Sequence, residues 1–338
     1  MKKILTIILS ALLMLSVFNL FACTPQEEVK EDNGTVSVRY YSSGADMLPL
    51  LKQGVLEMGV LPEPAATNLT KMASDKTWYR LSIQELYNSQ TKEYPQAVLM
   101  VKESLLNTYA SEINAFATQI DANITWAKQN KQTLVETINS KITGFTPTFN
   151  ANNLTDEVID NCNVYYQSAL DGKQSVKNYL RDIISLEPTS AKQVSDDYFY
   201  NGTANGTFDN NEIKVFVPDG APALAIAKYI YENQNFGLDK TFNYNIVKAE
   251  DIGSKIITGA GDIVILPVNA SSKLYKAYSQ DSYKMVGVVT HGNLYLMSSV
   301  PFVTLADKTV GVIGQGLVPD LTFRTILNNN KLKVSVKA

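Results

Sequence analysis

The apolar and polar positions between Val36 and Leu69 predict a strand, a short loop, an amphipathic helix and a second strand that ends in Leu-Pro. The same pattern returns later in the chain, and the two copies align without a gap. The aligned positions are Asp46 with Asp251, Gly54 with Gly259, Glu57 with Asp262, Leu61 with Leu266, Pro62 with Pro267, Ala65 with Ala270 and Leu69 with Leu274. The chain therefore contains a long-period repeat, and each copy predicts one βαβα unit.

Between residues 103 and 186 the pattern changes, because apolar positions recur at spacings near 3.6 and predict helices. We expect helical runs over residues 106–126, 132–142, 156–161 and 171–185. Residues 195–211 are rich in Asn, Gly and Asp, which predicts a linker or a surface turn. We interpret the two Asn-Gly-Thr sequences in this stretch as turn chemistry rather than as glycosylation sites.

Two further strand-loop-helix units resemble each other, one over residues 215–222 and the other over residues 310–319. Each has a strand, a glycine loop and a helix with an early Pro. The first unit is followed directly by the rest of its repeat copy, whereas the second stands at the C-terminus and its continuation stands at the N-terminus. We therefore hypothesise that the chain is circularly permuted, with the new join near residues 200–212.

This hypothesis predicts that residues 309–312 and 36–38 lie in one parallel sheet, although they are at opposite ends of the sequence. Val-Ser-Val occurs both at 36–38 and at 334–336. Only one of these segments can fill the central place in the sheet, so we expect residues 333–338 to be peripheral.

The composition is that of a globular protein, with 45% apolar and 19% charged residues in a chain of 338. This length is sufficient for two lobes, since single cores stop growing at roughly 250–300 residues. The net charge is −3 and the sequence has no basic cluster, so nucleic acid is excluded as a partner.

The first 23 residues contain Lys2 and Lys3, an apolar run and then Leu-Phe-Ala-Cys. This order is typical of a secretory signal whose cleavage frees Cys23 for lipid attachment, although Phe21 departs from the usual small or aliphatic residue. The alternative is a membrane anchor, for which the run is just long enough. Either reading places the body outside the cytoplasmic membrane, and we expect a lipid-anchored protein. Cys162 then has no disulfide partner, and we expect a free, buried thiol.

When the segments are placed in the order 212–338 and then 36–200, the sequence resembles bacterial ABC-transporter solute-binding proteins of the thiamine-precursor, sulfonate, nitrate and taurine type. The segments that carry the resemblance are VPDGAPALAIAK, GDIVILPVNAS, GNLYLMSS, KTVGVIGQGLVPDL, GVLPEPAAT, YPQAVLMVKESLL and DDYFY. The resemblance implies a two-lobed, periplasmic-binding-protein-like (type II) α/β fold. Each lobe is then a mixed, mainly parallel sheet flanked by helices, and two crossover strands join the lobes around a ligand cleft.

The resemblance also divides the chain into segments. These are a signal peptide (1–23), a polar tether (24–35), the second part of lobe II (36–97), a crossover strand with helices that pack on lobe I (98–200), a linker (201–211), lobe I (212–304) and the first part of lobe II (305–338). It implies a monomer without a cofactor, which captures a small organic molecule and delivers it to a membrane permease.

The candidate ligand site follows from the strand ends. In α/β sheets, ligands bind beyond the carboxyl ends of the strands, where glycines permit close backbone approach and helix N-termini present free N–H groups. The residues expected there are Asp219, Gly220, Ala221, Asn269, Gly314, Gln315, Gly316, Ser42, Ser43 and Glu63. Each of these residues could instead be an ordinary cap or turn residue. The prediction of a ligand site therefore depends on the whole set and not on any single residue. Asn293 and Tyr295, near an expected crossover strand, complete the candidates, and core packing is the alternative for Tyr295.

The charges in these loops bear on the ligand. Glu63 could neutralise a cationic ligand, or it could be a solvated residue ahead of Pro64 at a helix N-terminus. No Arg lies in any of the loops, so an anion would depend on helix N-termini alone. We therefore favour a neutral or weakly basic heterocycle over an anion such as a sulfonate.

The sequence lacks the groups of residues that catalysis usually requires. His291 is the only histidine, and no His or Cys cluster has metal-ligand spacing. We expect His291 to be a surface or hinge residue. The alternatives are an enzyme on the same fold, similar to chorismate dehydratases of menaquinone synthesis, and a sensory ligand-binding module. The chorismate dehydratases act in the cytoplasm, so the N-terminal signal argues against the enzyme.

Overall fold

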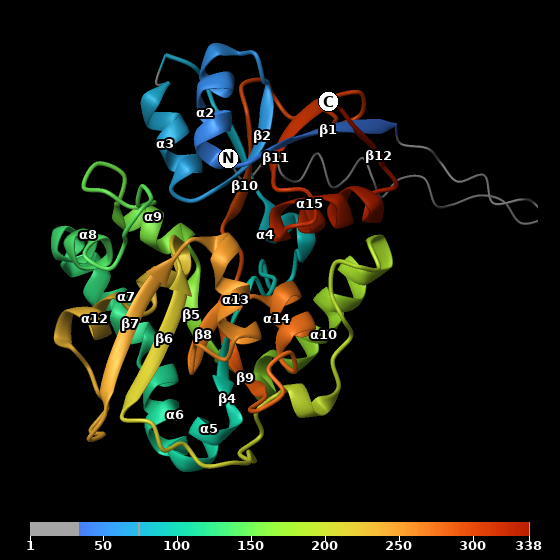
Figure 1. Ribbon diagram of the computed structural model, residues 1–338. Helices are drawn as coiled ribbons and strands as arrows, with labels where there is room; N and C mark the ends of the chain where they lie inside the picture. Colours follow the sequence, from blue (N-terminus) through green and yellow to red (C-terminus); the bar gives the residue numbers. More distant parts are fainter. Residues whose placement is uncertain (1–33, 74, 338) are drawn as a thin grey trace, which may run out of the picture. The chain divides into compact units, whose positions relative to one another are not determined.

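The computed structural model describes residues 34–73 and 75–337, and Cys23 lies outside them. Two six-stranded sheets organise this region (Figure 1). The lobe II sheet has the order β12 (Lys333–Val336), β1 (Thr35–Tyr41), β11 (Thr309–Ile313), β2 (Met58–Pro62), β10 (Leu294–Ser298) and β3 (Tyr79–Ser82). The lobe I sheet has the order β5 (Val164–Ser168), β9 (Tyr283–Thr290), β4 (Ala97–Lys102), β8 (Ile263–Pro267), β6 (Glu212–Pro218) and β7 (Thr241–Val247).

Both sheets are mixed. In lobe II only β10 runs against the other strands, because it pairs antiparallel with both β2 and β3. In lobe I the strands β7, β6 and β8 are parallel, whereas β4 runs against β8 and β9 and β5 runs against β9. The expected fold class, two lobes with mixed sheets flanked by helices, is confirmed. The lobe II sheet is mainly parallel as expected, whereas three of the five strand pairings in lobe I are antiparallel. β10 lies within the range expected for lobe I, but it pairs with strands of lobe II.

Helices cover both faces of each sheet. Those that follow lobe II strands are α2 (Gly44–Gln53), α3 (Ala65–Met72), α4 (Ile83–Tyr87) and α15 (Val318–Asn329). Those of lobe I are α5 (Glu103–Thr108), α6 (Ala110–Thr118), α7 (Ile120–Gln129), α8 (Lys131–Asn139), α9 (Asp156–Asn161), α10 (Ala169–Leu186), α11 (Ala221–Leu224), α12 (Ala227–Glu232), α13 (Ile252–Ile257) and α14 (Val268–Leu274), with 3₁₀ turns η1 (Asp196–Tyr198) and η2 (Ala249–Asp251). No helix of the described region is long and apolar enough to cross a membrane.

The pairing of the two chain ends agrees with the sequence prediction. β1 and β11 are parallel neighbours, with Ser37 opposite Thr309 and Val38 opposite Val310. β12 lies at the edge of the sheet and pairs with β1, so its expected peripheral position is also confirmed. The two Val-Ser-Val segments lie side by side in register, with Ser37 opposite Ser335. The permutation that led to these predictions stays a hypothesis.

The repeat has a structural counterpart at the end of its helix. Gly54 caps α2 with φ 77°, and its aligned partner Gly259 has φ 64°. Both values lie in the left-handed region, which glycine adopts without the steric cost that a Cβ atom brings. The repeated glycine is therefore required by backbone geometry at the same point of each unit.

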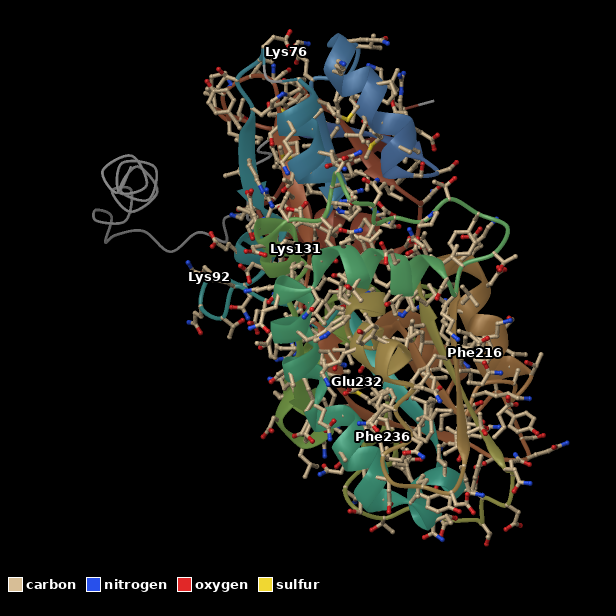
Figure 2. All side chains as sticks on the ribbon, turned by 90° about the vertical axis from the view of Figure 1, so that its left-hand side faces the viewer. Lys76, Lys92, Lys131, Phe216, Glu232 and Phe236 are labelled. Carbon is tan, nitrogen blue, oxygen red and sulfur yellow. The ribbon has the colours of Figure 1, made fainter. Side chains whose placement is uncertain are left out.

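Within the described residues the chain passes between the sheets at two places, over residues 88–96 between α4 and β4, and over residues 291–293 between β9 and β10. The first of these connections carries Lys92 on the outside of the molecule (Figure 2). The two crossings lie against each other, because the N–H of Tyr94 donates to the carbonyl of His291 at 3.4 Å. We call these two crossings the hinge.

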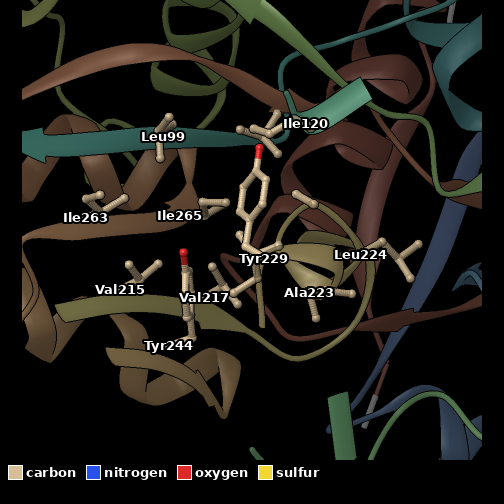
Figure 3. Close-up of a cluster of buried hydrophobic side chains, with 14 of the residues drawn as sticks. Leu99, Ile120, Val215, Val217, Ala223, Leu224, Tyr229, Tyr244, Ile263 and Ile265 are labelled. Carbon is tan, nitrogen blue, oxygen red and sulfur yellow. The ribbon is translucent and has the colours of Figure 1, made fainter. Parts of the chain in front are cut away.

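The core of lobe I is built from side chains of alternate positions on β4, β6 and β8 (Figure 3). Tyr229 of α12 packs in this core, and the buried Tyr229 hydroxyl donates to the carbonyl of Phe116 at 2.6 Å. On the opposite face of this sheet, a second apolar cluster continues through α10 and α15 into lobe II. The lobes therefore share packed side chains on that side.

Two sequence predictions needed revision. The helical run expected over residues 106–126 is divided among α5, α6 and α7, with breaks at Tyr109 and Gln119. Residues 195–211 are not a surface linker throughout, because Tyr198 and Phe199 are buried and the N–H of Tyr200 donates to the carbonyl of Met285. Apolar burial of these aromatic residues outweighs the turn-forming composition around them.

Candidate functional site

The centre of the hinge joins equivalent strand ends of the two lobes. After β2, the N–H of Glu63 donates to the carbonyl of Asn293 at 3.1 Å. After β8, the N–H of Val268 donates to the carbonyl of Gln96 at 3.0 Å. Gln96 Nε2 in turn donates to Asn293 Oδ1 at 3.0 Å. Each crossing is therefore hydrogen-bonded to the end of one strand, and the two crossings are hydrogen-bonded to each other. The Leu-Pro turns of the two repeat copies are thus placed on either side of one side-chain hydrogen bond.

Glu63 is buried, and its carboxylate is fully engaged. It accepts hydrogen bonds from Arg80 Nη2 at 2.6 Å, from Thr67 Oγ1 at 2.8 Å and from Asn161 Nδ2 at 3.0 Å. Of the two alternatives for Glu63, the solvated residue is therefore wrong, because the side chain is 0% exposed. Its charge is neutralised by Arg80, which lies in β3 and not in one of the loops at the strand ends. Asn161 belongs to α9, so this cluster connects the lobes.

Tyr295 belongs to the same cluster. The Arg80 guanidinium carbon lies 3.6 Å from the centre of its ring, and its hydroxyl donates to the carbonyl of Asn161 at 3.2 Å. Burial raises the pKa of Tyr295 to about 12. The cation and the ring attract each other, so the position of Arg80 is fixed by an ion pair on one side and an aromatic face on the other.

The lobe I candidates lie at the ends of β6 and β8. Asp219 Oδ2 accepts from the N–H of Thr148 at 2.7 Å, and its Oδ1 accepts from the N–H of Gly220 at 2.9 Å. Ala221 begins α11 directly after Gly220, which has φ 101°. Asn269 lies in the first turn of α14, buried, with Nδ2 at 3.4 Å from the carbonyl of Ser190. The long distance marks this as a weak hydrogen bond.

The lobe II candidates lie at the ends of β1 and β11. Ser43 is the N-cap of α2 and accepts from the N–H of Asp46, while Ser42 is exposed beside it. The N–H of Gly314 donates to the carbonyl of Tyr41, so the two turns lie together. Gln315 is exposed at the tip of its turn.

A second charged cluster stands behind the turn after β11. The N–H of Gly316 donates to Asp320 Oδ2 at 2.8 Å, and Asp320 is fully buried. Arg324 donates to both oxygens of Asp320 and also to Glu187 Oε2 at 2.6 Å. Tyr40 donates to Asp320 Oδ1, and burial together with this carboxylate raises the pKa of Tyr40. Because Glu187 follows α10, this cluster also connects the lobes.

The histidine and the cysteine that the sequence singled out are both buried. His291 lies in the hinge and is buried rather than on the surface, and burial lowers its pKa to about 4. Its ring stacks on Tyr165 with a centroid distance of 3.6 Å. Cys162 is the buried free thiol that was expected, and burial raises its pKa well above the usual value. Among the described residues, no group of three His, Cys, Asp or Glu side chains is placed to hold a metal ion.

Sequence reasoning missed the cations and the amide that complete these clusters. Arg80 lies in a stretch without clear periodicity, and Arg324 lies in the middle of an amphipathic helix. Asn161 lies at the end of a six-residue helix distant from Glu63 in the sequence. The i, i+4 spacing of Asp320 and Arg324 was the one local signal, because residues at that spacing are neighbours on a helix.

Comparison with known proteins gives only distant similarity. No family model matches the sequence, and no curated protein matches it. Among solved structures, the chain is similar to NikA from Staphylococcus aureus in complex with Ni(L-His)2 (TM-score 0.29, 9% identity, 77% of this chain and 56% of NikA). It is also similar to NikZ from Campylobacter jejuni in complex with Ni(L-His) (TM-score 0.29, 10% identity, 84% of this chain and 59% of NikZ). A third neighbour is the oligopeptide-binding protein OppA (TM-score 0.30, 8% identity, 87% of this chain and 55% of OppA).

This chain therefore spans less than two thirds of the length of each of these proteins. At these TM-scores and identities, the similarity assigns neither a ligand nor an activity to the chain.

Proposed function

We propose that this protein is the solute-binding component of an ABC importer, which captures a small organic molecule between its lobes and presents it to a membrane permease. The observation that carries the proposal is the hinge. Two short crossings, joined by the Gln96–Asn293 hydrogen bond, hold the ends of β2 and β8 from opposite sides. Two lobes on such a hinge can close around a ligand while each sheet stays rigid.

The arrangement of the strand ends supports a site between the lobes. The ends of parallel strands and the helix starts that follow them are the usual place for a ligand in α/β sheets. The turns at Asn269 and Gln315 follow β8 of lobe I and β11 of lobe II, and both carry polar side chains. We further propose that Cys23 carries a lipid anchor on the outer side of the cytoplasmic membrane and that the protein acts as a monomer.

The charges of the described residues favour a ligand without net charge. Glu63 is compensated by Arg80, and Asp219 accepts two backbone N–H groups. A neutral or weakly basic heterocycle, such as a thiamine-precursor pyrimidine, then needs directional hydrogen bonds rather than an opposite charge. A sulfonate or nitrate would have to rely on helix N-termini alone.

The test is a thermal-shift and calorimetric screen of the purified protein against an aminopyrimidine, thiamine, taurine, nitrate and aromatic acids, with chromatography of each ligand afterwards. We expect one class to bind and to be recovered unchanged. Conversion of the ligand would instead identify an enzyme, and no binding by any class would count against the proposed ligand range.

For the ligand found in this screen, Asn269→Ala and Gln315→Ala are each expected to raise the Kd about tenfold. A buried hydrogen bond of roughly 1.4 kcal/mol corresponds to that factor. Asn210 is an exposed residue between η1 and β6, and its substitution is the matched control. Asn210→Ala should leave the Kd unchanged. Calorimetric titration measures all three, and an unchanged Kd for both site variants would remove these residues from the site.

A further inference from the structure

A cavity of about 350 Å³ lies at the hinge. Its volume is near the lower end of the range for small-molecule sites, about 300–1,000 Å³. Tyr87 of α4, Asp182 of α10 and both crossings contribute to the lining, with Glu93 and Tyr94 from the first crossing and His291 from the second. None of the residues expected at the ligand site lines it. The cavity is therefore a separate feature shared by the two lobes.

The charges around this cavity are unbalanced toward the negative. Glu93 accepts a hydrogen bond from the Tyr165 hydroxyl at 2.6 Å. The imidazole Nδ1 of His291 lies 3.9 Å from the Glu93 carboxylate. Because burial lowers the pKa of His291 to about 4, the ring is neutral near pH 7 and does not compensate the carboxylate. A carboxylate offers about four lone-pair sites, so Glu93 retains capacity for a further donor.

Asp182 is the second carboxylate of the lining. It accepts from the Tyr87 hydroxyl at 2.8 Å and from Arg181 at 3.1 Å. The Arg181 side chain is 63% exposed. An ion pair this exposed contributes little to stability, about 0–1 kcal/mol. The lining thus holds two carboxylates and one guanidinium, so it carries a net negative charge that favours a cation.

Two aromatic residues also belong to the lining. Tyr87 and Tyr94 pack edge to face with ring centroids 5.7 Å apart, and both line the cavity. Aromatic faces attract ammonium groups, and they also accept a hydrocarbon chain. A ligand with a charged nitrogen and a short apolar stem satisfies both parts of the lining, whereas an anion meets two carboxylates.

We propose that this hinge cavity is a second binding site, which takes a small organic amine in its ammonium form. The ligand bridges the lobes, because Tyr87 follows a strand of lobe II and Asp182 lies on a helix of lobe I. Its contacts change when the lobes move about the hinge, so its affinity differs between the lobe arrangements. By linkage, amine binding then alters the affinity of the proposed solute site, and the solute alters that of the amine.

The experiment compares 1,4-diaminobutane with 1,4-butanediol at constant ionic strength, by thermal shift and calorimetric titration of the purified protein. The diamine is expected to bind and to raise the Tm, and the diol of equal chain length is expected to do neither. Glu93→Gln and Asp182→Asn each keep an oxygen for the neighbouring tyrosine hydroxyl and remove one charge. Each is expected to weaken diamine binding about tenfold or more, as charge-assisted hydrogen bonds are lost.

Glu250→Gln is the control, since this carboxylate is exposed and outside the cavity. It should bind the diamine like the unchanged protein. Equal effects of diamine and diol, or equal binding by Glu93→Gln and Glu250→Gln, would overturn the proposal. These outcomes are independent of the screen for the solute site, because neither probe belongs to its ligand classes.

Discussion

Arg80→Ala is expected to lower the free energy of unfolding by about 3–5 kcal/mol, the range for breaking a buried ion pair on one side. The substitution leaves the Glu63 carboxylate buried and without its cation. It also removes the guanidinium from the face of Tyr295. Urea denaturation at neutral pH measures the loss.

Two comparisons make this prediction specific. The double variant Arg80→Ala with Glu63→Gln should recover part of the loss, because no unpaired charge then remains in the interior. Lys92→Ala removes an ion pair whose side chains are 62% and 54% exposed, and it should cost less than about 1 kcal/mol. Equal losses for Arg80→Ala and Lys92→Ala would contradict the assigned role of the cluster.

Gly292→Ala is expected to destabilise the protein strongly, because Gly292 lies in the hinge with φ 92°. A Cβ atom there would lie 2.4 Å from Cγ of Gln84 and 2.6 Å from Cε1 of Tyr94. Backbone strain contributes about 1–3 kcal/mol and overpacking about 1–3 kcal/mol more, so the expected loss is about 2–6 kcal/mol. Thermal and urea unfolding measure it.

The chain offers a matched control for this substitution. Gly202 has φ 93°, and a Cβ atom there would meet nothing within 4 Å. Gly202→Ala therefore carries the backbone strain alone, about 1–3 kcal/mol. The difference between the two variants isolates the packing of the hinge. A loss for Gly292→Ala no larger than that for Gly202→Ala would show that the crossings are not tightly packed.

Local patterns were sufficient to predict much of the fold. The alternation of apolar residues predicted β1, a short continuous apolar run predicted β2, and the glycine and proline positions predicted where α2 ends and α3 begins. The repeat even predicted the long-range pairing of β1 with β11. These features share a cause, since each depends on backbone conformation or on a periodicity that neighbouring residues set.

The composition of the site was less accessible. Glu63 was singled out as a candidate, but its partners Arg80 and Asn161 come from another strand and from the other lobe. Whether a carboxylate is solvated or paired depends on which side chains the tertiary structure brings to it, and spacing along the sequence does not encode that. The same holds for Glu187, which reaches Arg324 across the lobes.

The hinge cavity was missed for a related reason. Glu93 follows a turn-rich stretch and Asp182 lies on the polar side of α10, so each resembles an ordinary surface acid. The two crossings, α4, α10 and residues of β5 and α15 line the space together. Cavities arise from packing between distant elements, and periodicity describes one element at a time.

The central claim is that the lobes close around a ligand by motion at the hinge. Spin labels at Lys52→Cys on α2 and Asn114→Cys on α6, in a Cys23→Ala background, report the distance between the lobes, because Cys162 is buried and inert. The account predicts that a saturating ligand from the screen shifts and narrows the distance distribution. A ligand that binds with full occupancy and leaves the distribution unchanged would contradict it.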